Sequence, residues 1–386
     1  MPVSGGRGEW GCRGSDVTLK SHALPGDPPR WPRDRAVDVR HILFELRLDV
    51  PAKAIEGTVT HTVSPLNDGL TAVEFDAVDL HIASVLLNSV PADYGYDGRK
   101  LAVKLGGGRK RGERLNIAIA YRATPRIGLY FIGPDEGYPD KPEQVWSQCQ
   151  DEDARYWFPC YDYPNEKQTT EMIVTVPGAW TALSNGRLVK EKTNRDGTKT
   201  FHWLQERPHS TYLVTLVAGE FARIDGTTGQ LPIDYWVEPD DVDRGRLTFK
   251  DTPAMIALFE RVTGVNYPWV KYSQVVVRDF VFGGMENTSA TTMTENILVD
   301  RKATRDFTSD DLISHELAHM WWGDLLTCRD WSHGWLNEGF ATFFEHVWRE
   351  HHEGKDEYLY GLLSDLDVWA DEDHGRYRRP IVTNRW

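Results

Sequence analysis

The sequence predicts two domains in series, an antiparallel β-sandwich or saddle followed by an α+β domain. Three observations lead to this fold class. Between residues 36 and 238, short segments alternate apolar and polar side chains with a period of two, and turn residues separate them. From residue 239 onward, apolar residues recur at helical spacing. The chain has 386 residues, 40% of them hydrophobic, which is enough for two or three domains with cores of their own.

The first segment, residues 1–35, is rich in Gly, Arg, Pro and Asp and contains no apolar stretch of the kind that a secretory signal needs. We expect it to be a disordered tail. The predicted sandwich, residues 36–238, shows the alternation most clearly at 41–50, 57–63 and 115–121, and turns containing Gly, Asn or Asp follow its strands. Many short strands with frequent turns are typical of a sandwich.

The second predicted domain covers residues 239–386. It begins with an amphipathic helix at 251–262, whose apolar face carries Met255, Leu258, Phe259 and Val262. The other elements expected here are strands at 273–277 and 290–294 and helices at 309–322 and 337–352. Strands that lead into helices make this domain α+β.

Charge and cysteine content exclude several classes of protein. The formal net charge is −14, and no run of Lys or Arg dominates any segment, so we expect no nucleic-acid partner. No stretch approaches the roughly 18 apolar residues of a membrane-spanning helix. The four cysteines are far apart and form no Cys-x-x-Cys pair. We therefore expect reduced thiols in a cytoplasmic protein without membrane contact.

The candidate chemistry is concentrated in His315-Glu-Leu-Ala-His319. Positions i and i+4 of a helix share one face, so both imidazoles can bind one metal ion. Glu316 can then take a proton from a water molecule that the metal acidifies. A catalytic zinc site needs a third protein ligand, and Glu338, in the next predicted helix, can supply it. The alternative for Glu338 is a solvated residue in a helix first turn, where the helix dipole favours a carboxylate.

The motifs together resemble those of the M1 (gluzincin) aminopeptidases. His315–Asp324 and Trp335–Phe340 are similar to the family pattern of HExxH, eighteen residues and then Glu, and Gly283-Gly-Met-Glu-Asn287 is similar to its exopeptidase motif. Residues 147–155 and 158–164 extend the resemblance into the first domain. The resemblance implies an N-terminal β-sandwich followed by a thermolysin-like catalytic domain, and a zinc-dependent aminopeptidase that acts on peptides with a free N-terminus.

The resemblance also assigns roles to individual residues. One Zn²⁺ per chain is bound by His315, His319 and Glu338, and Glu316 is the general base that assists attack of the zinc-bound water. Glu286 pairs with the substrate α-ammonium group and thereby sets the distance from the N-terminus to the cleaved bond. The other residues that we assign to the substrate site are Gly283, Gly284, Met285, Asn287, Gln148, Gln150 and Phe282. Asp324 either supports a zinc histidine or caps the helix.

The family pattern is incomplete in this sequence. Relatives have a tyrosine that stabilises the tetrahedral oxyanion roughly sixty residues beyond the third zinc ligand. That position lies beyond Trp386, and Tyr358, Tyr360 and Tyr377 come too early. We therefore expect an incomplete thermolysin-like domain that binds zinc but is poorly active and prone to aggregation.

Two other functions remain open. The first is a non-catalytic zinc-containing protein that binds peptides through Glu286, although Glu316 argues against it because binding needs no general base. The second is a bifunctional enzyme that also hydrolyses a lipid epoxide, as some Gly-Gly members of the family do. An epoxide substrate would distinguish this second alternative from a simple aminopeptidase.

Overall fold

The computed structural model describes residues 26, 28–374 and 380–385. Most of the predicted tail, residues 1–25 and 27, therefore lies outside the described residues, as does Tyr377. The described part of the tail is held by contacts with the sandwich. Arg33 forms an ion pair with the buried Asp76, and the Tyr161 hydroxyl donates a hydrogen bond to the carbonyl of Arg33 at 2.7 Å. In this part of the predicted tail, Arg33 therefore has partners in the folded domain.

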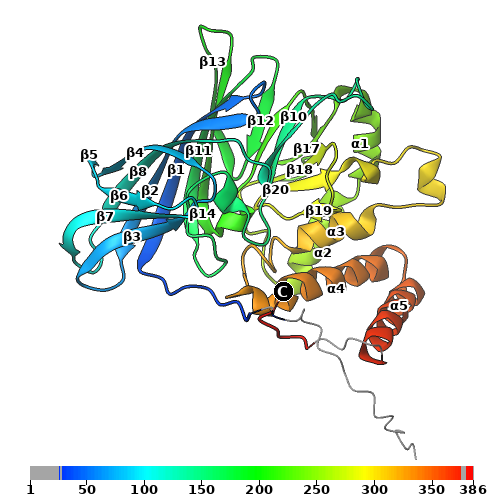
Figure 1. Ribbon diagram of the computed structural model, residues 1–386. Coiled ribbons are helices and arrows are strands. Elements are labelled where there is room, and N and C mark those ends of the chain that lie inside the picture. Colours follow the sequence, from blue (N-terminus) through cyan, green and yellow to red (C-terminus); the bar gives the residue numbers. More distant parts are fainter. Residues whose placement is uncertain (1–25, 27, 375–379, 386) are drawn as a thin grey trace, which may run out of the picture.

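The first domain is built on an eight-stranded sheet with the order β13-β14-β11-β1-β2-β8-β4-β5 (Figure 1). Residues along β1 alternate as expected, with Ile42, Phe44 and Leu46 buried and Glu45 and Arg47 exposed. The pair β1–β11 is parallel, and the other pairs in this sheet are antiparallel. The strands are β1 (Val37–Asp49), β2 (Ala54–Pro65), β4 (His81–Leu87), β5 (Val90–Pro91), β8 (Leu115–Ala123), β11 (Gln168–Val176), β13 (Arg187–Thr193) and β14 (Lys199–His209).

Two smaller sheets complete this domain and pack against the large one. The core between them is rich in aromatic residues, including Phe44, Trp146, Trp157 and Phe158. This confirms the predicted sandwich. The three-stranded sheet consists of β3 (Leu70–Asp76), β6 (Tyr94–Tyr96) and β7 (Lys100–Arg109), and the four-stranded sheet of β9 (Gly128–Ile132), β10 (Gln144–Gln148), β12 (Thr181–Ser184) and β15 (Leu216–Gly219).

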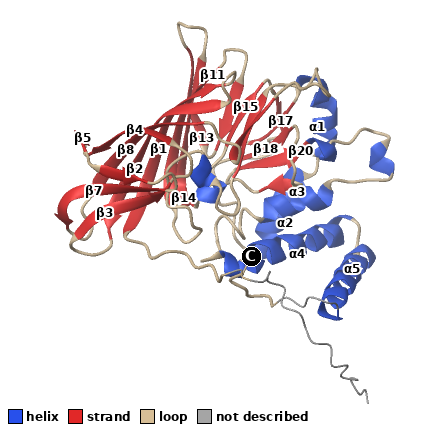
Figure 2. Ribbon diagram, viewed as in Figure 1, coloured by secondary structure: helices blue, strands red, loops and turns tan. Residues whose placement is uncertain are grey.

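The second part of the chain is a five-stranded sheet, in the order β16-β17-β18-β20-β19, with helices gathered on its side of the molecule (Figure 2). Its core packs Phe259, Trp321 and Phe344 edge to face. The strands are β16 (Ala222–Asp225), β17 (Ile233–Val237), β18 (Tyr272–Val277), β19 (Gly284–Met285) and β20 (Ala290–Thr294), and the helices are α1 (Val242–Thr248), α2 (Thr252–Thr263), α3 (Asp310–Ala318), α4 (Trp335–His352) and α5 (Lys355–His374).

Several element boundaries differ from the predicted ones. Because β16 and β17 are hydrogen-bonded into the second sheet, we propose that the second domain begins near residue 222 and not at residue 239. Helix α3 is shorter than expected and stops before His319. Helix α5 was not predicted, since its apolar residues lie all around the helix and give no clear period. Val262, expected on the buried face of α2, is exposed.

The remaining sequence-based expectations concern cysteines and membranes. Cys149, Cys160 and Cys328 are free and buried, and Cys12 lies outside the described residues. No helix in the described part of the chain combines the length and apolar character needed to span a membrane.

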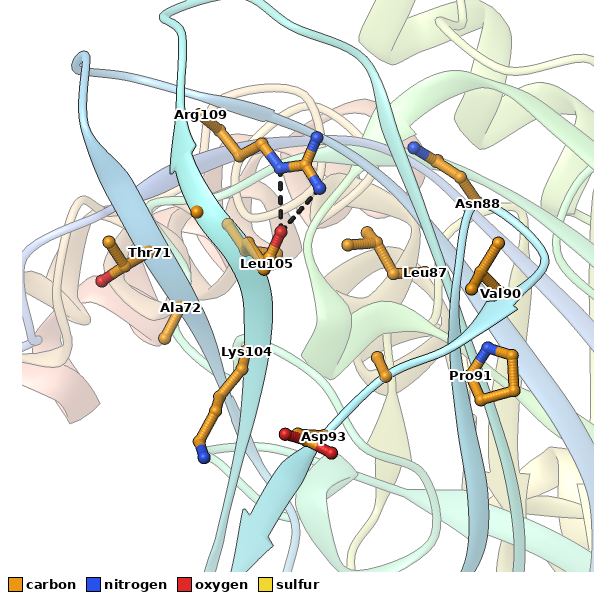
Figure 3. A pocket seen from close by; sticks show the side chains of 13 residues that line it. Thr71, Ala72, Leu87, Asn88, Val90, Pro91, Asp93, Lys104, Leu105 and Arg109 are labelled. Atoms are coloured by element: carbon orange, nitrogen blue, oxygen red, sulfur yellow. Dashed lines mark hydrogen bonds between the residues drawn. The ribbon is translucent and has the colours of Figure 1, made fainter.

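A cavity of about 910 Å³ lies in the first domain between β3 and β7 on one side and β4 and β5 on the other (Figure 3). The guanidinium group of Arg109 donates to the carbonyl of Leu105, and the other charged residues that line the cavity are Asp93 and Lys104. None of the predicted site residues borders this cavity.

Candidate metal and substrate site

The three predicted metal ligands converge on one point. Helix α3 carries His315 and ends next to His319, and α4 carries Glu338 in its first turn. The two Nε2 atoms are 3.1 Å apart, and Oε2 of Glu338 is 3.5 Å from each of them. Ligand atoms about 2.1 Å from a zinc ion in a tetrahedral site are about 3.4 Å apart. The three atoms thus form one face of such a site, and its fourth position faces the cleft described below.

The second nitrogen of each imidazole fixes its orientation. Nδ1 of His315 lies 2.7 Å from Oε1 of Glu345, and Nδ1 of His319 lies 2.9 Å from the carbonyl oxygen of Trp322. Both partners are acceptors when Glu345 is ionised, so each Nδ1 carries a proton and each Nε2 presents a lone pair. Two lone pairs at 3.1 Å repel each other unless a cation lies between them. The donor set therefore fits a metal ion.

The chain after α3 bends sharply to create one of these contacts. Gly323 has a φ of +128°, and a side chain there would lie 3.0 Å from Nδ1 of His319. Glycine accepts both the left-handed backbone and the close approach. The bend places the carbonyl of Trp322 against the imidazole.

The surroundings of the histidines also favour positive charge. Burial lowers the pKa of His315, but the neighbouring carboxylates of Glu338 and Glu345 outweigh it and raise the pKa to about 9. For His319, burial is likewise outweighed by Glu286 and Glu338, and its pKa is raised. A proton or a metal cation at this point is therefore stabilised by the carboxylates around it.

Glu316 is buried next to the two histidines and, like them, borders a cavity of about 450 Å³ in the second domain. Its Oε2 atom has no hydrogen-bond partner among the described residues. Burial raises the pKa of Glu316 to about 8, although the histidines His315 and His319 act in the opposite direction. Gly284 makes room for this side chain, because a Cβ atom there would lie 2.6 Å from Cγ of Glu316 and closer still to its carboxylate. Gly284 therefore serves the packing of Glu316 as well as the approach of a ligand.

Glu286 follows β19 and borders the same cavity. The side chain is buried, its pKa is raised mainly by that burial, and Oε1 finds no hydrogen-bond partner in the described part of the chain. A buried carboxylate oxygen without a partner is available to an ammonium group. This is the arrangement expected for a group that receives a peptide N-terminus.

The cavity has a volume of about 450 Å³ and brings together most of the predicted site. The predicted residues that line it are Gln150, Gly283, Gly284, Glu286, His315, Glu316, His319 and Glu338. Its other lining residues are Asp311, Leu312 and Glu345.

The remaining predicted site residues lie away from this cavity. Met285 is part of the hydrophobic core, and the amide of Asn287 donates to Thr292 Oγ1 at 3.1 Å. Neither Met285 nor Asn287 is among the residues that line the cavity. Phe282 is exposed and packs edge to face on Phe280. The structure thus assigns the two flanking motif residues to packing.

Gln148 and Asp324 are buried outside the lining of the cavity. Oε1 of Gln148 and both carboxylate oxygens of Asp324 have no hydrogen-bond partner among the described residues. Nδ1 of His319 contacts the Trp322 carbonyl and not a carboxylate oxygen of Asp324, whose charge nevertheless acts on His319. Burial raises the pKa of Asp324 well above its ordinary value.

Sequence reasoning missed Glu345, which orients His315. Glu345 lies seven residues after Glu338 on α4, which is two helical turns, so both carboxylates face α3. The spacing of Glu338 and Glu345 could have identified Glu345 as a candidate from the sequence. The contact itself depends on the packing of α3 against α4.

A second group of possible metal ligands, Asp251, Asp310 and His352, has ligand atoms within 4.8 Å of one another. Asp310 already accepts a hydrogen bond from Trp348 at 3.1 Å, and Asp251 lies 3.4 Å from the ammonium group of Lys250. These partners account for the two carboxylates, so we do not assign a metal to this group.

Comparison with known proteins agrees with the fold. Residues 39–213 match the Peptidase M1 N-terminal domain, and residues 247–385 match the Peptidase family M1 domain. Among curated relatives, leukotriene A-4 hydrolase of Xenopus laevis is 27% identical over 332 residues, which cover 83% of this chain and 52% of the relative. Leucine aminopeptidase 2 of Aspergillus fumigatus is 29% identical over 335 residues, with coverages of 83% and 53%. The chain spans about half the length of these relatives.

Solved structures of similar proteins match the fold of this chain. The M1 zinc metallopeptidase of Deinococcus radiodurans superposes with a TM-score of 0.74 at 25% identity, covering 91% of this chain and 78% of that one. Native yeast LTA4 hydrolase superposes with a TM-score of 0.75 at 23% identity, covering 88% of this chain and 52% of that one. At this low identity, the second match supports the fold only.

Proposed function

The chain belongs to peptidase family M1, and on this premise we propose that it is a zinc-dependent aminopeptidase that removes N-terminal residues from peptides. One observation carries the proposal: a three-ligand metal site, a buried carboxylate beside it (Glu316) and a second buried carboxylate (Glu286) line one space of about 450 Å³. The first two groups suit hydrolysis, and the third suits recognition of a free amine.

His315, His319 and Glu338 would hold the metal ion. A Zn²⁺ ion bound there acidifies water and polarises a carbonyl group. The match between ligand spacing and zinc geometry supports this assignment, as does the presence of a defined acceptor for each Nδ1 proton. We propose one zinc ion per chain.

Glu316 would take the proton from the attacking water and pass it to the leaving amine. A base must be ionised, and burial opposes the ionisation of this carboxyl group. A dication close by lowers the pKa of a carboxyl group. We therefore expect Glu316 to be active only when the metal site is filled.

Glu286 would bind the α-ammonium group of the substrate. Its distance from the metal ligands is set by rigid elements, β19 and α3, so only a peptide bond one residue from the N-terminus would reach the metal. An N-acetylated peptide lacks the positively charged α-ammonium group and would leave the Glu286 carboxylate buried without a counter-charge.

Hydrolysis of a fluorogenic aminoacyl amide tests this proposal, with zinc content measured on the same sample. We expect hydrolysis of the free-amine substrate and none of its N-acetylated form, and Glu316→Gln should abolish turnover while zinc stays bound. Equal hydrolysis of both substrates would contradict the role of Glu286. Loss of zinc in Glu316→Gln would contradict the role of Glu316.

A second candidate is a zinc-containing peptide-binding protein without turnover. The observation in its favour is that no Tyr, Lys or Arg lines the cavity in the described part of the chain, so a donor for the oxyanion is not evident. Zinc binding together with amine binding, but without hydrolysis, would identify this function. For either function we propose a cytoplasmic location, which the free thiols of Cys149, Cys160 and Cys328 support.

A further inference from the structure

The three metal ligands differ in how firmly the fold holds them. His315 and His319 are held by Glu345 and by the carbonyl of Trp322. Glu338, in contrast, has a side chain that is 49% exposed. A long, half-exposed side chain samples several rotamers, and ordering it costs conformational entropy. The third ligand therefore depends most on a neighbour that holds it in place.

Gln150 is that neighbour. Its Nε2 atom donates a hydrogen bond to Oε1 of Glu338 at 3.1 Å, across 188 residues of sequence. The other oxygen, Oε2, is the atom that lies 3.5 Å from both imidazole Nε2 atoms. The hydrogen bond thus selects which oxygen of Glu338 faces the metal position. A glutamate at residue 150 could not donate this bond in its ionised form.

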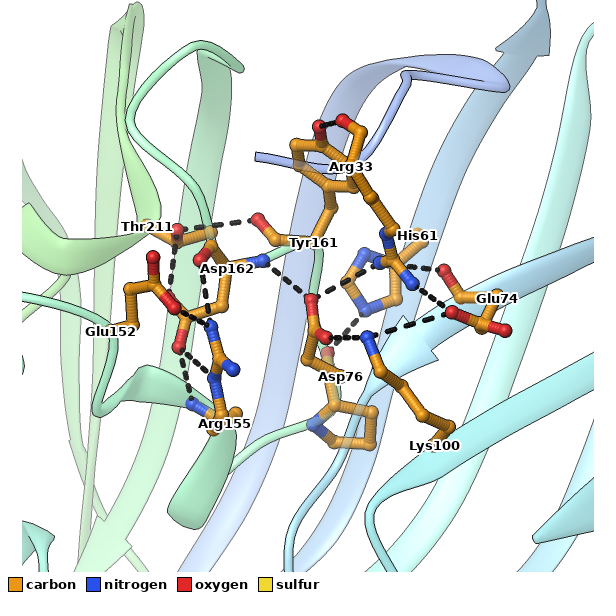
Figure 4. A network of polar contacts seen from close by, with 11 residues as sticks. Arg33, His61, Glu74, Asp76, Lys100, Glu152, Arg155, Tyr161, Asp162 and Thr211 are labelled. Atoms are coloured by element: carbon orange, nitrogen blue, oxygen red, sulfur yellow. Dashed lines mark hydrogen bonds and ion pairs between the residues drawn. The ribbon is translucent and has the colours of Figure 1, made fainter. Parts of the chain in front are cut away.

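The segment that carries Gln150 is anchored by a buried ionic network (Figure 4). Arg155 donates to Oδ2 of Asp162 at 3.0 Å, and the amide of Asp162 donates to Oδ2 of Asp76 at 3.0 Å. Arg33 and Lys100 also pair with Asp76, whose side chain is almost fully buried. The carboxylates of Asp76 and Asp162 are almost fully buried, so separating them from their basic partners would leave a buried charge unpaired.

A backbone connection strengthens this anchor. The amide of Asp76 donates to the carbonyl of Cys160 at 2.6 Å, and the amide of Cys160 donates to Asp76 at 2.9 Å. The segment between β10 and β11 is thereby tied to β3 of the first domain. Gln150 can therefore transmit a fixed position from the sandwich to a metal ligand on α4.

We propose that Gln150 is a positioning residue for the third metal ligand, and that the ionic network of Arg33, Asp76, Arg155 and Asp162 keeps it in place. This inference rests on the proposed zinc site. It differs from the role that the sequence suggested for Gln150, which was a contact with the substrate amine. It also explains how a domain without metal ligands contributes to the metal site.

The test is the zinc affinity of the full chain, measured by competition with a chromogenic chelator. Gln150→Met keeps the length of the side chain and removes its donor, and we expect zinc to bind about 10- to 100-fold more weakly. Gln148→Met is the matched control, since Gln148 lies two residues away and does not contact Glu338; its zinc affinity should equal that of the parent. Circular dichroism of the zinc-free proteins checks that both variants fold.

A double-mutant cycle separates positioning from a general structural effect. In an E338A background, Gln150→Met should cause no further loss of zinc affinity, because the acceptor is gone. An equal loss in both backgrounds would overturn the inference. So would a Gln150→Met protein that binds zinc normally but shows a raised KM for free-amine substrates, which would return Gln150 to the amine site. Failure of the parent chain itself to bind zinc would overturn the proposed function and this inference together.

Discussion

Replacement of Gly284 by alanine tests the geometry of the candidate base most directly. Gly284 has no positive φ, so alanine fits the backbone. The added methyl group would lie 2.6 Å from Cγ of Glu316, whereas carbon atoms in contact are about 3.5 Å or more apart. Glu316 must therefore move by roughly 1 Å, and a displacement of this size at a reacting group typically costs about 100-fold in rate. The three atoms nearest to this methyl group all belong to Glu316 and none to a metal ligand, so we expect zinc to remain bound.

The assay compares kcat/KM for an aminoacyl amide between the parent chain, Gly284→Ala and Gly283→Ala. The Gly283 variant is the control, because its methyl group would meet only the terminal carbons of Leu312, at 3.0 and 3.4 Å. A leucine side chain can shift by a few tenths of an ångström, so we expect a change of less than about threefold. A Gly284→Ala enzyme with parental kcat/KM would show that Glu316 is not the base or that its position is not limiting.

Three further predictions concern single side chains. Glu345→Gln removes the carboxylate that orients His315, and zinc affinity should fall about 10- to 100-fold in a chelator competition. Glu286→Gln should raise KM for free-amine substrates and bring their hydrolysis close to that of N-acetylated ones; an unchanged preference would contradict its role. Burial lowers the pKa of His61 from 6.5 to about 4, against the opposing effect of the Pro159 carbonyl. As the pH falls, His61 is protonated in the unfolded chain at a higher pH than in the folded chain. The free energy of unfolding therefore decreases between about pH 6.5 and pH 4, and the loss is about 2 kcal/mol at pH 5. In urea unfolding at pH 5 and pH 7, His61→Gln should reduce the difference in stability between the two pH values, and an unchanged difference would refute the assignment.

Local patterns in the sequence predicted the elements near the site well. The strands at 273–277 and 290–294 correspond to β18 and β20, in which β-branched Val and Thr residues are frequent. The pairing of His315 with His319 follows from the helical repeat alone. Helix α5 has no such pattern, which is why it was missed.

The structure separates residues that the sequence motifs name together. Glu286 borders the cavity, whereas Met285 and Asn287 are buried outside its lining. Asp324 is close to His319 in the sequence, but the hydrogen-bond partner of Nδ1 of His319 is the carbonyl of Trp322.

The sequence by itself determined the family, the three ligand types and the order in which they occur, since these depend on residue identity and on spacing within single helices. The tertiary structure decided which groups hold the ligands. Glu345 reaches His315 only because α3 and α4 pack together, and Gln150 reaches Glu338 only because a loop of the sandwich is anchored beside α4. Contacts between residues far apart in the chain depend on how elements pack, and no local period in the sequence encodes that packing.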